Sequence, residues 1–361
     1  MQYFKNIRFV NFRNFNKNSY EFSKSCNVLY GQNGSGKTNI LEGISLFSKG
    51  RGIRKDKLSN IVKKKYDKFI IKSDFNNDEI IYNLTLETQI QKNKIRKILS
   101  VNNDISKEST DIINEFISFL YFLPENERLF ISSPSNRRNF IDRLIFSYKN
   151  LYNKKINEYN KFLQERSKLL TQNIFDESWL IQLEKKISSY GLDIYLIREA
   201  QINILKKNLN IYLKKFNLPF NINVELDDKF YNNNIDHEFY IQQLKNNRKI
   251  DSLIGGSKIG PHKSDYIFYI NDNFEVSQLS TGQQKTLILL IYLSQCEYLV
   301  TIKKKQPILL LDEVCSHLDD VNRKILLTLL ESFKLQVFMT GTTKNLFSFL
   351  STNTNFCNIE S

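Results

Sequence analysis

The sequence predicts an α/β protein whose mixed sheet surrounds a phosphate-binding loop, with an antiparallel subdomain and an inserted all-α helical hairpin. The glycine-rich octapeptide 31–38 lies between a short apolar strand and a helix, as phosphate-binding loops do. Residues 307–313 form a second apolar strand that ends in two acidic residues. Between these segments, apolar residues recur every three or four positions across 141–204, which is the period of long helices.

The composition bounds the size of the protein and the charge of its partners. A chain of 361 residues can form one to three domains. Its formal net charge is +14, from 52 Lys and Arg against 38 Asp and Glu, and this excess favours a polyanionic partner. The chain is also rich in Lys, Asn and Ile, which a biased coding composition would produce as well. The net charge is therefore only a modest indication of a polyanionic partner.

Cysteine spacing and hydropathy indicate the compartment. The four cysteines are scattered and form no Cys-x-x-Cys pair, which predicts reduced thiols. The start of the chain alternates like a strand and lacks the apolar core of a signal peptide. The most apolar run, 287–300, is interrupted by polar residues and is too short to cross a bilayer. We therefore expect a soluble, cytoplasmic protein with no membrane partner.

The octapeptide fits the Walker A pattern G-x-x-x-x-G-K-[ST], and its residues form the predicted nucleotide-binding set: Gly31, Gln32, Asn33, Gly34, Ser35, Gly36, Lys37 and Thr38. Glycines let backbone N–H groups form a concavity for phosphate oxygens, because a Cβ there would block the approach. We expect Lys37 to reach the β- and γ-phosphates of ATP and the Thr38 hydroxyl to bind Mg²⁺. An unoccupied glycine-rich turn is the alternative, which the flanking strand 27–30 and helix 39–47 disfavour.

The segments before the insertion predict short strands joined by Asn and Asp turns, at residues 2–12, 68–75, 79–87 and 95–101. The basic loop 49–55 between them carries Arg51 and Arg54. Both arginines are candidates for contacts to phosphates of a nucleotide or of DNA. A solvated surface loop is an equally good interpretation of this segment.

A helix start is predicted at 132–138, after the apolar stretch 111–123. Its first turn contains Arg137 and Arg138, whose charges oppose the helix macrodipole. Either the two arginines face an anion such as a DNA phosphate, or Arg138 pairs with Asp142 four residues on.

Two long helices are predicted next, over the apolar series 141–163 and 180–204, with a short connection between them. Gly191 inside the second series weakens the case for an unbroken helix. A strand at 222–226, a helix at 235–248 and a strand at 266–270 follow. The predicted domains are a head formed by residues 1–128 and 216–361, and a helical arm formed by residues 129–215.

The second half of a nucleotide site follows the apolar strand 307–311. Asp312 can hold Mg²⁺ opposite Thr38, directly or through water. Glu313 is placed to orient or deprotonate an attacking water. The predicted catalytic residues are therefore Lys37, Asp312 and Glu313.

The segment Leu279-Ser280-Thr281-Gly282-Gln283-Gln284 resembles the signature motif of the ABC-type ATPases. In that class, the signature binds the γ-phosphate of ATP held by the Walker A loop of the other subunit. The resemblance therefore implies a homodimer, with nucleotide contacts from Ser280, Gly282 and Gln283. Residues 316–319 resemble the D-loop of the class. Transporter ATPases usually carry a switch histidine after the next strand, whereas this chain has Thr-Gly-Thr-Thr at 340–343.

Four further segments resemble the RecF family of bacterial DNA replication and repair proteins, over essentially the full chain: residues 11–14, 50–54, 133–142 and 260–265. The blocks Ser-Pro-Ser-Asn-Arg-Arg and Gly-Pro-His-Lys belong to no generic ATPase pattern. The resemblance implies an ABC-type, SMC-like head with a helical arm and weak ATP hydrolysis. It also implies ATP-dependent dimers on gapped, single-stranded or double-stranded DNA, which help RecO and RecR to load RecA during recombinational repair and the processing of replication gaps.

Other functions are less consistent with the sequence. A transporter subunit needs a membrane partner and a switch histidine. An SMC-type structural protein needs a long coiled coil between its head halves, for which Lys37 and Ser280 are too close in sequence. A scaffold with a degenerate nucleotide site is disfavoured, because the residues that define the site are all present: Lys37, Thr38, Asp312 and Glu313. An ATP-dependent DNA-binding protein is the leading hypothesis.

Overall fold

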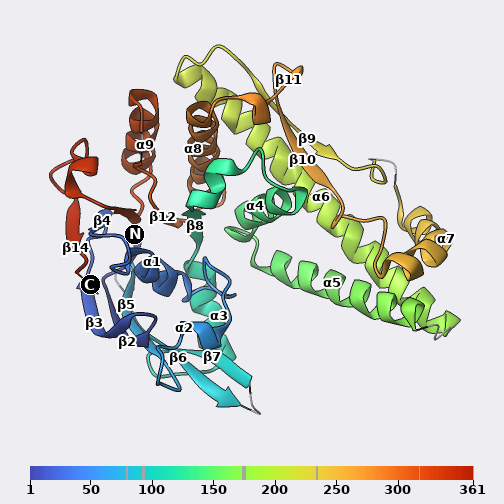
Figure 1. Ribbon diagram of the computed structural model, residues 1–361, viewed down its shortest axis with the longest axis horizontal. Helices are drawn as coiled ribbons and strands as arrows, with labels where there is room; N and C mark the ends of the chain where they lie inside the picture. Colours follow the sequence, from blue (N-terminus) through green and yellow to red (C-terminus); the bar gives the residue numbers. More distant parts are fainter. Residues whose placement is uncertain (79, 92–93, 173–175, 233–234, 317, 361) are drawn as a thin grey trace. The chain divides into compact units, whose positions relative to one another are not determined.

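The computed structural model describes residues 1–360 except 79, 92–93, 173–175, 233–234 and 317 (Figure 1). The chain forms two compact units. The first consists of Met1–Glu127 and Lys285–Ser361, and the second of Arg128–Gln284.

A parallel sheet of five strands forms the centre of the first unit, in the order β14-β4-β13-β12-β8. Its strands are β4 (Cys26–Tyr30), β8 (Phe119–Phe122), β12 (Ile308–Leu311), β13 (Val337–Gly341) and β14 (Asn355–Asn358). All residues of β12 and β13 are buried, as expected for strands covered on both faces. The associated helices are α1 (Lys37–Ser45), α8 (Thr281–Glu297), most of which belongs to this unit, and α9 (Asp320–Ser332). The predicted strand–loop–helix around the Walker A motif and the predicted buried strand before Asp312 are both confirmed.

The antiparallel subdomain is the second sheet of this unit, with the order β3-β2-β5-β6-β7 and with β1 paired to β5. Its strands are β1 (Gln2–Phe4), β2 (Asn6–Phe12), β3 (Phe15–Glu21), β5 (Ile70–Asn77), β6 (Ile80–Gln91) and β7 (Lys94–Val101). The short helices α2 (Leu58–Ile61) and α3 (Lys107–Phe116) and the 3₁₀ helix η1 (Pro124–Arg128) complete this part of the chain. The strands predicted here are confirmed.

Aromatic side chains join the two sheets of the first unit in one core. The ring of Phe4 contacts Phe75 of the antiparallel sheet, Phe119 of the parallel sheet and Phe47 after α1. The buried amide of Gln336 also donates to the carbonyl of Phe4 and accepts from its N–H, both at 2.8 Å. The position of the phosphate loop is therefore fixed by a continuous core.

The second unit contains α4 (Pro134–Phe146), α5 (Asn150–Thr171), α6 (Glu177–Lys215) and α7 (His237–Ile254). It also contains a small antiparallel sheet of β11 (Phe274–Glu275), β10 (Asp265–Ile270) and β9 (Ile222–Asp227). The inserted unit is therefore not all-α. The sequence assigned residues 216–284 to the head, whereas in the structure they belong to this unit, because β9 pairs with β10 and α7 packs on α5 and α6.

The predicted first long helix is wrong, because the chain turns between α4 and α5. No Gly or Pro marks this turn. The turn brings the Tyr152 hydroxyl to Asp142, to which it donates at 2.6 Å. The predicted second helix is confirmed as α6, and it passes through Gly191 unbroken. A Cβ at Gly191 would lie 2.8 Å from the ring of Tyr240 on α7, so glycine permits the close packing of the two helices. Part of the predicted connection between the two helices lies outside the described residues.

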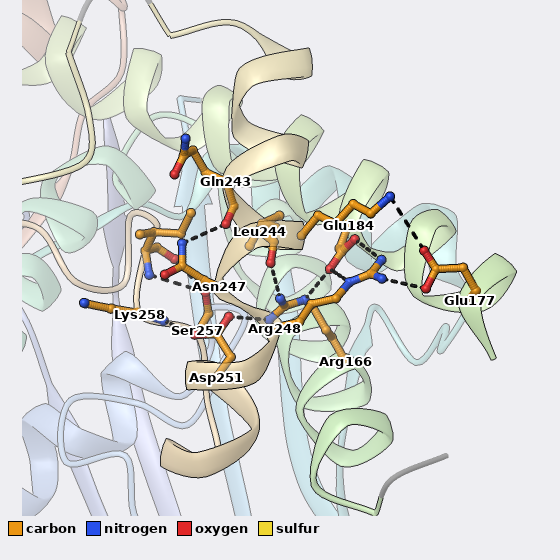
Figure 2. Close-up of polar contacts among 12 residues, drawn as sticks. Arg166, Glu177, Glu184, Gln243, Leu244, Asn247, Arg248, Asp251, Ser257 and Lys258 are labelled. Atoms are coloured by element: carbon orange, nitrogen blue, oxygen red, sulfur yellow. Dashed lines mark hydrogen bonds and ion pairs between the residues drawn. The ribbon is translucent and has the colours of Figure 1, made fainter. Parts of the chain in front are cut away.

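A buried ionic cluster ties together α5, α6 and α7 (Figure 2). The guanidinium of Arg166 donates to Glu184 at 3.0 Å, to Asp251 at 2.7 Å and to the carbonyl of Leu244 at 2.7 Å. Arg248 closes on the other carboxylate oxygen of Glu184 at 2.6 Å. Arg166 is 1% exposed and both carboxylates are fully buried, so every charge in the cluster is paired, as burial requires.

One stretch of the described residues, Thr281–Ile302, is long and apolar enough to cross a membrane. It comprises α8 and the π-helical turn that follows it, and most of its apolar surface is buried inside the protein. These are the features of a core helix in a folded domain.

Candidate nucleotide-binding site

The phosphate loop connects β4 to α1 in a conformation that only glycines permit. Gly31, Gly34 and Gly36 have φ angles of +154°, +87° and +107°, in the region that side chains disfavour. A Cβ at Gly36 would lie 2.7 Å from the ring of Phe15, and one at Gly31 would lie 2.4 Å from the carbonyl oxygen of Ile359. The sequence pattern and the steric requirement therefore agree at each glycine that contacts a neighbour.

The backbone of the phosphate loop holds the Lys37 side chain in place. Its ammonium donates to the carbonyl oxygens of Gly31 and Gln32, both at 2.8 Å, and the side chain is largely buried. Burial lowers the pKa of Lys37, and the nearby carboxylates of Glu313 and Asp312 oppose that shift. The ammonium is thus positioned beside the loop and close to Asp312 and Glu313, the two acidic residues that follow β12.

The loop also contains an unsatisfied donor. The hydroxyl of Ser35 is buried, with no hydrogen-bond partner among the residues that the structure describes. A buried hydroxyl without a partner is unfavourable, and a phosphate oxygen would accept from it. The residues of the loop therefore fit a bound phosphate group.

Asp312 and Thr38 meet as the sequence predicts. The Thr38 hydroxyl lies 3.1 Å from each carboxylate oxygen of Asp312, although the two residues are far apart in sequence. Thr340 on β13 donates to the Asp312 carboxylate at 2.6 Å. A hydroxyl and a carboxylate are hard oxygen ligands of the kind Mg²⁺ prefers, so this pair fits the predicted metal.

Glu313 is exposed directly after the buried Asp312. Its φ of +53° is unusual for a residue with a side chain. Its backbone N–H donates to the hydroxyl of Thr340 at 2.9 Å. The structure therefore brings the three predicted catalytic residues, Lys37, Asp312 and Glu313, to one end of the parallel sheet.

The signature residues lie at the start of α8, in the second unit. Ser280 and Gln283 form a reciprocal cap, in which the Gln283 side chain accepts from the N–H of Ser280 at 3.1 Å and the Ser280 hydroxyl accepts from the N–H of Gln283 at 3.4 Å. Both residues and Gly282 are exposed, and a Cβ at Gly282 would meet no atom within 4 Å. The signature is thus an open helix start. His317 of the predicted D-loop lies outside the described residues.

Two of the candidate DNA-contacting arginines lie in the basic loop after α1. Arg51 is exposed. Arg54 donates to the side chain of Asn39 at 2.8 Å and lies 3.6 Å from Glu42, so it is held along α1. This loop is therefore partly ordered by the Walker helix and is not only solvated.

The other two candidates bind within the second unit. The guanidinium of Arg137 binds Asp265 through two hydrogen bonds of 2.7 and 2.5 Å, and Arg138 donates to the carbonyl of Ser264 at 2.6 Å. The alternative pairing of Arg138 with Asp142 is wrong, because Asp142 binds Arg198 at 2.9 Å. The two distinctive sequence blocks therefore bind each other, and contact of Arg137 or Arg138 with DNA stays a prediction.

Sequence reasoning missed two contacts at this site and one pair of basic residues on the antiparallel sheet. Arg13 binds the fully buried Glu42 of α1, and Thr340 binds Asp312, although neither pairing has a local sequence signal. Arg8 on β2 and Lys72 on β5 are exposed and lie directly opposite each other in the antiparallel sheet. The alternation of β2 and β5 would have placed both on the solvent face, but only the register shows that they are neighbours.

Comparison with known proteins agrees with this geometry. The family model described as the RecF/RecN/SMC N-terminal domain matches residues 3–358. The DNA replication and repair protein RecF of Rickettsia africae is 32% identical over 335 residues, which is 92% of each chain. The corresponding protein of Rickettsia akari is 31% identical over 342 residues, covering 93% of each chain.

Solved structures give the same result. A structure of the recombination mediator protein RecF with ATP, in the RecFOR pathway, has a TM-score of 0.82 at 30% identity and covers 97% of this chain and 94% of the other. An Smc head domain from Pyrococcus furiosus, at 17% identity and a TM-score of 0.55, shares the fold and covers 96% of this chain and 92% of the other. The predicted ABC-type, SMC-like fold is therefore confirmed. The chain belongs to the RecF family of DNA replication and repair proteins.

Proposed function

We propose that this protein is an ATP-binding DNA repair protein of the RecFOR pathway and a weak cytoplasmic ATPase, in which ATP binding drives dimerisation on DNA and hydrolysis reverses it. The observation that carries the proposal is the convergence of Lys37, Thr38 and Asp312 on a phosphate loop with an unsatisfied Ser35 hydroxyl. The similarity to the structure of RecF with ATP supports the choice of nucleotide.

The residues of the site have different roles in hydrolysis. The backbone of the loop and Lys37 bind the phosphates, and Ser35 donates to one of their oxygens. Thr38 and Asp312 would hold Mg²⁺, which when bound with the nucleotide neutralises charge on the phosphates. Glu313 accepts a proton from, or orients, the attacking water. The exposed position of Glu313 agrees with a water-activating role.

The signature supports a dimer. Ser280, Gly282 and Gln283 are exposed at a helix start, where N–H groups and the helix dipole favour a phosphate. In the class that the motif resembles, this start closes on nucleotide held by the other subunit. We therefore propose that two copies enclose ATP between the Walker A loop of one and the signature of its partner.

A basic strip on the antiparallel sheet is the proposed DNA contact. Arg8 and Lys72 are exposed opposite each other, and Lys17 on β3 is exposed on the same face of the sheet. Neither Arg8 nor Lys72 forms a salt bridge in the described part of the chain. Like charges directly opposite each other repel, and a phosphate between them would relieve the repulsion. Arg51 and Arg54 are proposed to add contacts from the loop after α1.

The proposed partners are gapped, single-stranded or double-stranded DNA, together with RecO and RecR, with RecA loading as the outcome. The relatives named RecF and the RecFOR pathway named for the solved structures support this proposal. Phosphate contacts of this kind give binding that tolerates any sequence and weakens steeply with salt.

Sedimentation with and without ATP tests the dimer. A Glu313→Gln chain should bind ATP without turnover and sediment as a dimer with ATP and as a monomer without it. Ser280→Arg in the same background should remain a monomer while ATP binding is nearly unchanged. Asn273→Arg is the control for added charge, because Asn273 is exposed in the same unit but outside the signature. A Glu313→Gln chain that stays monomeric with saturating ATP would refute the proposed dimer.

A further inference from the structure

β13 ends at the nucleotide site with a threonine and a glycine. This strand lies between β12, which carries Asp312 at its end, and β4, which leads into the phosphate loop. Thr340 near its end is fully buried. Transporter ATPases have a histidine after this strand, so the chemistry that Thr340 contributes is not explained by the motifs.

We infer that Thr340 is a positioning residue for hydrolysis, which fixes the Asp312 carboxylate and the backbone of Glu313 through one hydroxyl. The inference rests on the proposed ATPase function. The hydroxyl donates to Oδ1 of Asp312 at 2.6 Å and accepts from the N–H of Glu313 at 2.9 Å. A hydroxyl is suited to this arrangement because it is both a donor and an acceptor.

The first bond sets the direction of the Asp312 carboxylate. Its two oxygens lie at equal distances of 3.1 Å from the Thr38 hydroxyl, while Oδ1 also accepts from Thr340. With Oδ1 held, rotation of the carboxylate is restricted and the oxygens remain directed at Thr38. Partners of this kind orient a metal ligand and typically change metal affinity or activity 10–100-fold when removed.

The second bond sets the direction of the Glu313 side chain. A φ of +53° is strained for a residue other than glycine, and such strain persists only where neighbours hold it. The bond from the N–H of Glu313 to Thr340 is one such restraint. Losing it would let the backbone at Glu313 relax and would move the carboxylate that acts on water.

The neighbouring Gly341 leaves no space for a side chain next to Thr340. A Cβ at Gly341 would lie 2.5 Å from the ring of Phe347, so a histidine has no space there. The carbonyl of Gly341 also accepts from the N–H of Gly31 at 3.3 Å. The end of β13 is therefore bonded to both halves of the site, to the phosphate loop through Gly341 and to Asp312 and Glu313 through Thr340.

Three substitutions separate positioning from simple packing. Thr340→Val keeps the shape and removes the hydroxyl, and Thr340→Ser keeps the hydroxyl. Thr342→Val is the matched control, because Thr342 is exposed two residues away. We expect Thr340→Val to lower kcat for ATP hydrolysis about 10–100-fold and to raise the Mg²⁺ concentration for half-maximal rate by a similar factor. The KM for ATP at saturating Mg²⁺ should change less than about 3-fold, and Thr340→Ser should restore most of kcat.

A binding measurement gives a readout without turnover. For the wild-type chain, the rise in Tm caused by ATP should be larger with Mg²⁺ than with EDTA. Thr340→Val should keep the rise in EDTA and lose most of the additional rise with Mg²⁺. Equal Mg²⁺-dependent rises in Thr340→Val and wild type would overturn the inference, as would a loss in Thr340→Ser equal to that in Thr340→Val.

Two further results distinguish failure of the inference from a folding defect and from failure of the proposed function. If Thr340→Val does not fold, Thr340→Cys, whose thiol is a poor donor, is measured in its place with the same expectation. If the wild-type chain itself neither hydrolyses ATP nor shows a rise in Tm with it, the proposed function fails, and the inference falls with it. Normal wild-type behaviour with an unaffected Thr340→Val overturns the inference alone.

Discussion

The guanidinium of Arg13 donates two hydrogen bonds, of 2.8 and 2.6 Å, to the carboxylate of Glu42. Glu42 is fully buried in α1, the helix that begins at the phosphate loop. The same guanidinium binds Asp56 at 2.8 Å, and Arg54 lies 3.6 Å from Glu42. One carboxylate of α1 thus fixes both the turn after β2 and the basic loop that follows α1.

We expect Glu42→Gln to lower the free energy of unfolding by about 3 kcal/mol, because it leaves a largely buried guanidinium without its main counter-charge. Urea titration of the full chain measures the change. Asp111→Asn is the matched control, because its pair with Lys49 is exposed at both ends and should stabilise the protein much less. Equal small losses in the two variants would mean that the Arg13–Glu42 pair stabilises no more than a surface pair.

The basic strip makes a quantitative prediction about DNA binding. Replacing Arg8 and Lys72 with Glu together should weaken binding to duplex DNA and reduce the slope of log affinity against log salt by about 2, one unit for each lost phosphate contact. Filter binding across a salt series measures both quantities. Lys24→Glu combined with Lys324→Glu is the control for net charge, because it changes the charge by the same amount and both lysines are exposed in the same unit but outside the strip. An unchanged slope in the double variant would exclude the strip as the DNA contact.

The parts of the site that are contiguous in sequence were predictable, and those that depend on register were not. Residues 31–38 and the strand before Asp312 carry their geometry in local patterns of glycine and apolar residues. The contact of Thr340 with Asp312 depends on how β13 aligns with β12, which no local pattern records. The turn between α4 and α5 was missed because neither Gly nor Pro stands there. Hydrogen bonds to Asp142 from Tyr152 of α5 and Arg198 of α6 hold α4 against these helices.

The roles of Arg137 and Asp265 were also out of reach of the sequence, because the partners are 128 positions apart. We expect both Arg137→Gln and Asp265→Asn to lower the Tm of the protein, since each breaks the same partly buried pair. Arg137→Gln should lower it more, because Arg137 also donates to the carbonyls of Phe130 and Ser132. If Arg137 also contacts DNA, Arg137→Gln alone should reduce the salt slope of DNA binding by about 1. Calorimetry and filter binding on the same samples separate the two roles, and a loss of stability confined to one variant would contradict the pairing.

His262 makes the stability of the protein depend on pH. Its Nε2 donates to the carbonyl of Ser257 at 3.0 Å, so in the neutral ring Nδ1 accepts from the hydroxyl of Tyr159 at 2.8 Å. Burial lowers the pKa of His262 to about 4, a carbonyl bond opposes the shift, and the charges of Lys263, Arg138 and Arg198 add to it.

The sign of the effect follows from proton binding. Between pH of about 6.5, the ordinary pKa of histidine, and the lowered pKa of about 4, the unfolded chain binds a proton that the folded chain does not. Stability contributed by neutral His262 is therefore complete above pH 6.5 and is lost as the pH falls, by about 2 kcal/mol at pH 5.

Urea titrations at pH 7 and pH 5 should show this loss in the wild type and a correspondingly smaller one in His262→Gln, which keeps an acceptor and a donor but cannot titrate. His237→Gln is the control histidine, because His237 is exposed at the start of α7. The same loss in wild type and His262→Gln would show that the acid sensitivity arises from carboxylates elsewhere in the chain and not from this ring.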